Sequence, residues 1–134
     1  MILFGRHEAR PVQSALALRF EPPQREADVS DYLALFTTLA GQPVPFVLLS
    51  DLRGFRLDHA GEVQQNRVAK ATREAVAARI RGLVLLSDRP SERQRAAFST
   101  FWSIPVEVHD DIPAANTAFL ALHDRVFGPG GTGA

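Results

Sequence analysis

The sequence predicts a single α/β domain, a sandwich in which a mixed, mostly parallel sheet is flanked by about four helices. Residues 46–49 and residues 83–86 are continuous apolar runs, which are typical of strands covered on both faces. Residues 61–81, between them, contain no proline and are rich in Ala, Gln, Arg and Glu, a composition that favours a helix. This strand, helix, strand order predicts that the two apolar runs pair in parallel through a helical crossover.

Two short strands are expected before the first helix, at residues 2–4 and residues 14–20, on either side of Pro11. Period-two spacing puts Leu16 and Leu18 on one face of the second strand. We expect this pair to form a hairpin or an edge pair at one side of the sheet. An exposed edge strand there could pair with a second copy of the chain, so a homodimer is one expectation.

The first helix is expected to begin at Asp28 or Ser30, because both side chains suit an N-cap, and to end before Gly41. Its apolar residues recur at helical spacing, so they are expected to face the sheet. They are Val29, Leu33, Phe36 and Leu39.

The last third of the chain is expected to add a helix, a strand and a helix. Ser91 with Gln94 matches a capping box that starts a helix, residues 106–109 suit a strand, and Asp110 or Asp111 caps the final helix. The apolar face of the third helix is expected to lie in the core, and Phe98→Ala to cost about 3–5 kcal/mol. That face comprises Ala97, Phe98, Phe101 and Trp102.

Length and composition narrow the class of protein. The 134 residues suit one domain, expected over residues 1–127, followed by a flexible tail at residues 128–134 that contains four glycines. Fifteen basic and fifteen acidic residues cancel, which argues against sequence-independent nucleic-acid binding. The absence of cysteine excludes disulfides, thiol nucleophiles and zinc-thiolate sites. No run suits a membrane span or a signal peptide, so we expect a cytoplasmic protein.

Acidic residues follow three of the expected strands. Ligands on open α/β sheets usually bind beyond the carboxyl ends of the parallel strands, where Asp51, Asp88 and Asp110 are placed. If these three carboxylates converge, they could hold a hard cation such as magnesium. The alternative interpretation is structural, because Asp and Ser are favoured in the turns that lead into helices.

A second group of candidates surrounds the start of the second helix. Asp58 and His59 could form a carboxylate and histidine pair, although adjacent residues rarely point toward one another. Arg67 and Lys70 belong to a basic strip that could meet an acidic partner or headgroup, or simply face solvent. The chain contains no serine elbow or HExxH motif, and its histidines fit structural or surface roles better than catalytic ones.

The segment Val-Leu-Leu-Ser-Asp-Leu-Arg-Gly at residues 47–54 resembles the strand and acidic turn before the phosphorylation loop of the STAS family. The element order over residues 2–127 is also similar to that family, the fold of bacterial anti-sigma-factor antagonists, and to its Sec14-type lipid-binding relatives. Where the family has Asp-Ser-x-Gly, this chain has Asp58-His59-Ala60-Gly61, without the phosphorylatable serine. The resemblance therefore implies the fold and a candidate site at Asp58 and Gly61, but no kinase-driven partner switching.

The function that these observations favour is a non-enzymatic regulatory or binding module that takes a protein partner or a small apolar ligand and needs no cofactor. Its candidate binding residues are Asp51, Asp58, His59, Gly61, Arg67, Lys70 and Asp88. One alternative is a metal-dependent hydrolase or phosphotransfer domain that uses Asp51, Asp88 and Asp110. Another is a carrier of an apolar ligand such as a lipid, which requires a cavity.

Overall fold

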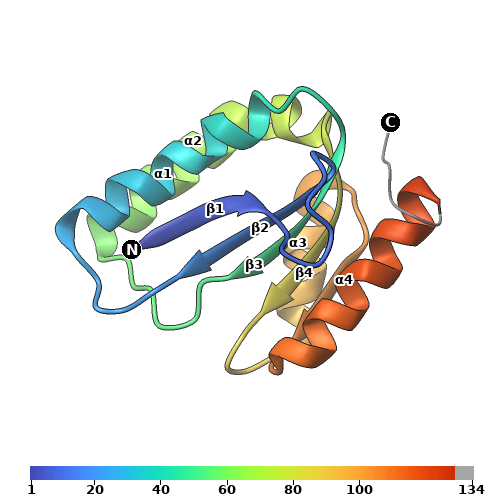
Figure 1. The fold of residues 1–134 in the computed structure, drawn as a ribbon. Coiled ribbons are helices and arrows are strands. Elements are labelled where there is room, and N and C mark those ends of the chain that lie inside the picture. Colours follow the sequence, from blue (N-terminus) through green and yellow to red (C-terminus); the bar gives the residue numbers. More distant parts are fainter. Residues whose placement is uncertain (129–134) are drawn as a thin grey trace.

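A computed structural model describes residues 1–128 as a five-stranded sheet with four helices, which confirms the α/β class (Figure 1). The elements are β1 (Ile2–Arg6), β2 (Ala15–Phe20), α1 (Glu26–Ala40), β3 (Phe46–Asp51), α2 (His59–Ala77), β4 (Ile80–Leu86), α3 (Glu92–Trp102), β5 (Val106–His109) and α4 (Ile112–Phe127). The tail expected at residues 128–134 lies outside the described residues except for Gly128. Within the described range, no helix combines the length and the apolar character needed to cross a membrane.

The strands lie side by side in the same order as in the sequence, β1 to β5. Only β1 and β2 pair antiparallel, at one edge of the sheet, and every later pair is parallel. In the pairing of β3 with β4, Leu48 lies beside Leu83 and Leu49 beside Val84. The expected parallel pairing of the two apolar runs is therefore confirmed, and so is the edge position of the amino-terminal hairpin. Dimerisation through that edge stays a prediction.

The strand order dictates which face each helix covers. Right-handed crossovers that always step in one direction place their helices on the same face of a sheet. Accordingly, α1, α2 and α3 contribute to one hydrophobic core, whereas α4 forms a separate core on the opposite face. Figure 1 shows α1 and α2 side by side along the sheet, with α4 apart from them. We call the first side the three-helix face and the second the α4 face.

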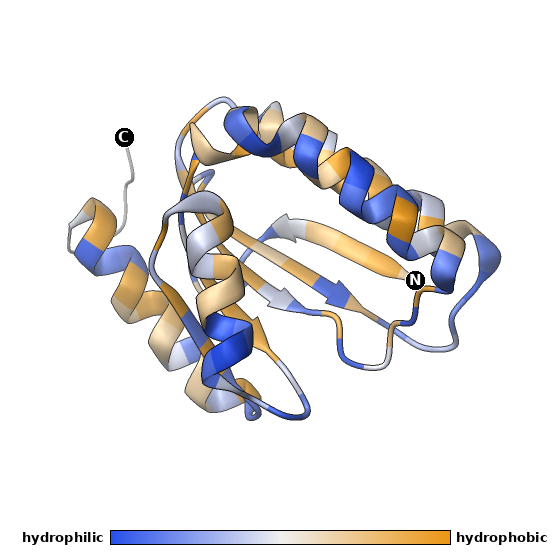
Figure 2. Ribbon diagram, turned by 180° about the vertical axis from the view of Figure 1, so that it is seen from behind, coloured by the Kyte–Doolittle hydropathy of each residue, from blue (hydrophilic) through white to orange (hydrophobic). Residues whose placement is uncertain are grey.

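Successive side chains of the central strands point to opposite faces and so contribute to both cores. Phe46 and Leu48 of β3 join the core of the three-helix face, and Val47 and Leu49 join that of the α4 face. Figure 2 shows these strands as predominantly hydrophobic, between helices of mixed polarity. By the same alternation, Ser50 lies on the three-helix face and Asp51 on the α4 face.

The structure corrects the start of two helices. α1 begins at Glu26 and not at Asp28 or Ser30. The buried Asp28 carboxylate instead reaches back, so that Oδ2 accepts the Arg25 backbone N–H at 2.7 Å and also lies 3.1 Å from the Met1 amine. α2 begins at His59, before the expected Gly61, because Asp58 is its N-cap. The N-caps expected at Ser91 and at Asp111 are confirmed. The capping box expected at Ser91 is only half formed, because Gln94 Oε1 accepts no hydrogen bond within residues 1–128.

The tight fit of α4 on the sheet gives a first prediction. A Cβ added at Gly82 of β4 would lie 2.8 Å from Cδ2 of Leu122, a buried side chain of α4. Gly82→Ala is therefore expected to lower the free energy of unfolding by about 1–3 kcal/mol, the usual cost of overpacking. Gly5→Ala in β1 is the control, since nothing lies within 4 Å of its added Cβ. Urea denaturation measures both, and equal stability of the two variants would contradict the packing assignment.

Candidate functional site

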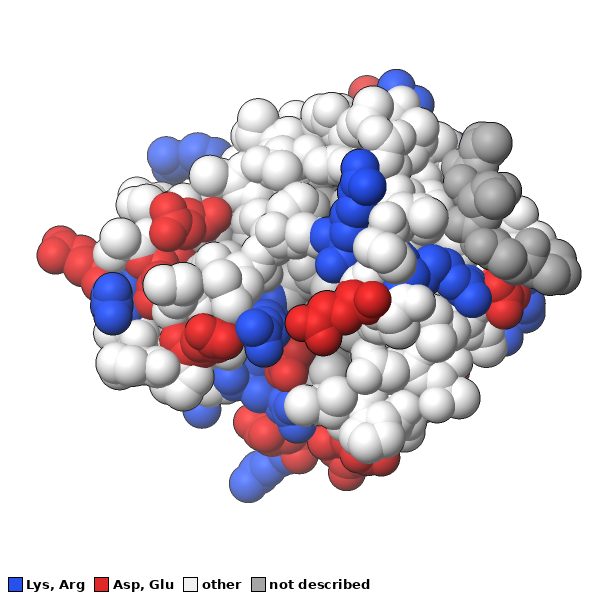
Figure 3. Space-filling model, viewed as in Figure 1, with Lys and Arg blue, Asp and Glu red and all other residues white. Residues whose placement is uncertain are grey.

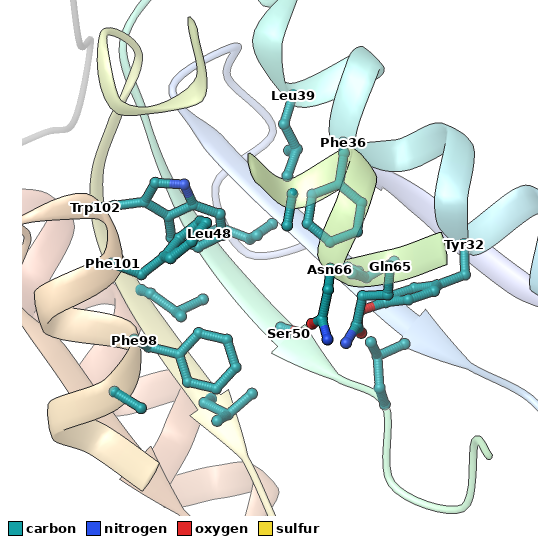
Figure 4. Close-up of a pocket in the computed structure, with 16 residues that line it drawn as sticks. Tyr32, Phe36, Leu39, Leu48, Ser50, Gln65, Asn66, Phe98, Phe101 and Trp102 are labelled. Carbon is teal, nitrogen blue, oxygen red and sulfur yellow. The ribbon is translucent and has the colours of Figure 1, made fainter. Parts of the chain in front are cut away.

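A pocket opens between the helices and the sheet on the three-helix face, with a volume of about 300 Å³ (Figure 4). Its floor is formed by leucines of β2, β3 and β4, and its walls come from α1, α2 and α3. The lining residues are Leu18, Tyr32, Phe36, Leu39, Leu48, Ser50, Leu52, Gln65, Asn66, Ala69, Leu83, Leu85, Ala97, Phe98, Phe101 and Trp102. A concave, mostly apolar pocket with a few polar groups is the usual form of a small-molecule site.

The pocket exists because α2 contributes little bulk to this face. α2 is 19 residues long, yet only Gly61 and Val76 are buried in it. Where α2 crosses the pocket, it presents Gln65, Asn66 and Ala69. Short or polar side chains cannot fill the volume that a leucine or phenylalanine would occupy against the sheet, so a cavity remains.

Two groups of aromatic rings face the cavity. Tyr32 and Phe36 of α1 pack edge to face, with ring centroids 5.7 Å apart. Phe98, Phe101 and Trp102 of α3 form the second group, in which the Phe101 and Trp102 centroids are 5.3 Å apart. Figure 4 shows the α1 and α3 rings on opposite sides of the cavity. Aromatic faces and edges suit contact with an apolar ligand.

The α3 aromatic group is supported from α2 by Arg73. Its Nε donates to the Phe101 carbonyl oxygen at 2.8 Å, and its guanidinium lies 4.8 Å from the centroid of the Phe101 ring. This arrangement combines a hydrogen bond with a cation–π contact. It holds the wall formed by α3 against α2.

Polar side-chain groups gather at one end of the pocket, on Tyr32, Ser50, Gln65 and Asn66. Trp102, on α3, is the fifth lining residue with a polar group. Tyr32 Oη donates to Gln65 Oε1, and Figure 4 shows Asn66 beside Gln65 and near Ser50. Burial raises the pKa of Tyr32 to about 12, so its phenol is neutral at physiological pH. On the α3 side, the buried Trp102 Nε1 has no hydrogen-bond partner within residues 1–128.

A more polar groove continues from the pocket. It has a volume of about 460 Å³ and shares Tyr32, Leu52, Gln65 and Asn66 with the pocket. Its other walls come from the loop between β3 and α2 and from the first turn of α2, including Arg56 and Glu62. The groove therefore adjoins the polar end of the pocket and carries one charge of each sign.

The acidic rim expected at the strand ends does not form a metal site in the structure. Asp51 is engaged by Arg53, whose Nε and Nη2 donate to its two carboxylate oxygens at 2.8 and 2.9 Å. Burial alone would raise the pKa of Asp51, but the hydrogen bonds from Arg53 hold it below its ordinary value. Arg53 Nη1 also donates to the Asp110 carbonyl oxygen at 3.2 Å. Among residues 1–128, no three Asp, Glu, His or Cys side chains converge as a metal site would require.

The strand order explains why that expectation was wrong. The crevice at the carboxyl ends of strands arises where the strand order reverses and neighbouring crossovers go to opposite faces. Here the order never reverses, so Asp51, Asp88 and Asp110 border no such crevice. Asp88 and Asp110 are exposed. The pocket instead lies on the three-helix face, between the sheet and the helices α1, α2 and α3.

The other predicted site residues lie on α2 or at its N-cap, and they do not line the pocket. Asp58 caps the helix by accepting the Gly61 N–H at 2.7 Å, and both border an open hollow near the start of α1. His59 is exposed at the first position of the helix. Arg67 and Lys70 are exposed on α2. Figure 3 shows acidic and basic side chains intermixed over the face that it presents. Of the regions that the sequence pointed to as sites, only the end of β3 contributes to the pocket, through Ser50 and the adjoining Leu52.

A buried polar cluster on the α4 face links Ser14 to His123, but it is not arranged for nucleophilic catalysis. Arg10 Nη1 lies 3.0 Å from His123 Nδ1, and arginine can only donate, so Nδ1 accepts. The ring proton is then on Nε2, which donates to Ser14 Oγ at 2.8 Å. A histidine that activates a serine must instead accept the hydroxyl proton. The cluster joins α4 to the loop before β2, a structural role.

No protein-family model matches the sequence, and comparison with curated proteins and with solved structures finds no match. The function must therefore be inferred from the pocket itself.

The pocket changes the expected role of Phe98. This side chain is only partly buried because one side faces the cavity, whereas Phe119 of α4 is completely buried. We expect Phe98→Ala to lower the free energy of unfolding by about 1–2 kcal/mol and Phe119→Ala by about 3–5 kcal/mol. Urea denaturation compares the two variants. An equal loss would show that Phe98 is a core residue, as the sequence suggested.

The buried cluster predicts a pH dependence of stability. Burial, aided by the charge of Arg10, lowers the pKa of His123 below its ordinary value of 6.5. The contribution of the neutral ring is thus complete above pH 6.5 and is lost as the pH falls below that value toward the lower folded-state pKa.

Urea denaturation from about pH 7.5 to about pH 5.5 tests this dependence. We expect His123→Leu to flatten the decline in stability, and His59→Ala, at an exposed position, to retain it. Parallel pH profiles for the wild type and His123→Leu would contradict the assignment.

Proposed function

We propose that this protein is a non-enzymatic, STAS-like binding module that holds a small apolar molecule in the pocket of the three-helix face. The observation that carries the proposal is a cavity of about 300 Å³ whose lining includes five aromatic residues and no charged one. An engineered apolar cavity of about 150 Å³ is enough to bind benzene in another protein. A ligand in this pocket would cover apolar surface that the protein otherwise leaves open to water, and that transfer favours binding.

The proposal is distinct from partner regulation by phosphorylation and from metal-dependent hydrolysis. Phosphorylation of the family type requires a hydroxyl at the position of His59, and this chain has none there. Metal-dependent chemistry would need Asp51, which is already paired with Arg53. The pocket needs neither group, because burial of apolar surface and a few hydrogen bonds suffice for binding.

Filling the pocket tests the proposal. Ala69 of α2 lines the cavity, and a phenylalanine there would occupy ligand volume; Ala71, two residues on, is exposed and provides the matched control. We expect Ala69→Phe to abolish ligand binding, while Ala71→Phe retains it. Both variants should remain folded by circular dichroism.

The ligands for this test are ten-carbon and naphthyl compounds that carry alcohol, carboxylate or amine groups. Trp102 is the sole tryptophan of the chain and lines the pocket, so its fluorescence reports occupancy by the non-aromatic compounds, and calorimetry covers the rest. At a ligand concentration ten times Kd, the thermal midpoint of the wild type should rise by about 5 °C. Failure of every compound to bind, or equal binding to Ala69→Phe, would refute the proposal.

A further inference from the structure

We infer that the ligand of this pocket is an uncharged amphiphile, with an apolar body of roughly ten non-hydrogen atoms and a hydroxyl or carbonyl group placed near Ser50. The inference rests on the proposed binding function and adds the chemical class of the ligand. Three features lead to it: the polar groups at Ser50 and Asn66, the absence of charge from the lining, and the volume of the cavity.

Ser50 places a hydroxyl in an otherwise apolar floor. It follows Phe46 and Leu48 on the same face of β3, and it is only 6% exposed. Ser50 lines the cavity and makes no hydrogen bond to another side chain among those found within residues 1–128, so its hydroxyl is open to a ligand group. Figure 4 shows the Asn66 side chain extending from α2 toward the same region. A polar ligand group placed there would meet a donor and an acceptor from each side chain.

Trp102 contributes an aromatic wall and no accessible polar group. Its side chain lines the pocket from α3 and the residue is 8% exposed, yet the indole Nε1 lacks a partner within residues 1–128. That nitrogen is fully enclosed, so it is out of reach of a ligand in the cavity and sets no requirement on the head group. The head group is therefore selected at Ser50 and Asn66, whose side chains can pair with neutral hydroxyl and carbonyl groups.

Charge restricts the head group. None of the lining side chains is charged, since Tyr32 stays protonated at physiological pH. Arg73 is directed to the Phe101 carbonyl and ring, and Asp51 lies on the α4 face with Arg53. In the adjoining groove, Arg56 and Glu62 offer opposite charges and give no preference for either sign. A carboxylate or ammonium ion in the pocket would therefore lose hydration without gaining an ionic partner.

The volume sets the size of the apolar body. At about 30 Å³ for each water-sized group, a cavity of about 300 Å³ holds roughly ten non-hydrogen atoms. This is about the size of a ten-carbon chain or a fused pair of aromatic rings. A long-chain diacyl lipid is too large to be enclosed.

Paired ligands that differ in head-group charge test the inference. Calorimetry at about pH 8, where carboxylic acids are ionised, would compare 1-decanol with decanoate and 2-naphthol with 2-naphthoate. At least one alcohol should bind at least tenfold more tightly than its carboxylate, a difference of about 1.4 kcal/mol. Equal or tighter binding of both carboxylates would overturn the uncharged class while leaving the binding function intact. If no compound binds, the binding function fails as well.

Ser50→Ala tests the position of the head group, with Ser87→Ala as control. Both serines follow a Leu-Leu pair and precede an aspartate, but Ser50 lies within β3, whereas Ser87 directly follows the adjacent β4 and does not line the pocket. We expect Ser50→Ala to weaken binding of the favoured alcohol about fivefold, in line with one hydrogen bond, and Ser87→Ala to leave it unchanged. Naphthalene, which lacks the hydroxyl, should bind Ser50→Ala as well as it binds the wild type. Unchanged alcohol binding, or equal weakening for naphthalene, would overturn the role of Ser50.

Discussion

The arrangement of this protein depends on a sheet whose strands follow one another in chain order. A step in one direction at every crossover sends α1, α2 and α3 to the same face and leaves α4 to cover the other. Three helices must then share one face of a short sheet. The pocket lies where that shared cover is thinnest, beneath the middle of α2 and beside α3.

The two faces are built differently. On the α4 face, a single helix inserts Ala115, Phe119 and Leu122 among strand residues, and the close approach of Leu122 to Gly82 leaves no spare volume. On the three-helix face, Leu39, Val76 and Trp102 contribute to a core that does not extend over the whole sheet. The first face supplies packing that is independent of a ligand. The second face combines a partial core with an accessible cavity, the feature on which the proposed function rests.

The architecture was predictable from local sequence because its signals are local. The continuous apolar runs of β3 and β4, the proline-free segment of α2 and the caps at Ser91 and Asp111 each act within a few residues. The pocket was less predictable, because its walls come from residues far apart in the sequence, such as Tyr32, Asn66 and Phe98. A cavity is a deficit of volume, and hydrophobic periodicity does not report volume.

Two signals of the pocket were nevertheless present in the sequence. The second helix carries Gln65 and Asn66 where a helix packed on a sheet would be apolar, and the third helix gathers Phe98, Phe101 and Trp102 within five positions. The strand-end aspartates suggested a metal site that does not form, because Asp51 is paired with Arg53, only two residues away. A carboxylate with an arginine so near is better interpreted first as one half of an ion pair.

The Tyr32–Gln65 hydrogen bond joins α1 to α2 at the boundary between the pocket and the groove. Because it connects two helices and involves no strand, the width of the entrance is governed by the spacing of those helices. Substitutions at this contact between helices can thus change the size of the entrance, while the sheet and the packing of α4 stay as they are. The opening of the cavity and the second core are therefore set by separate parts of the fold.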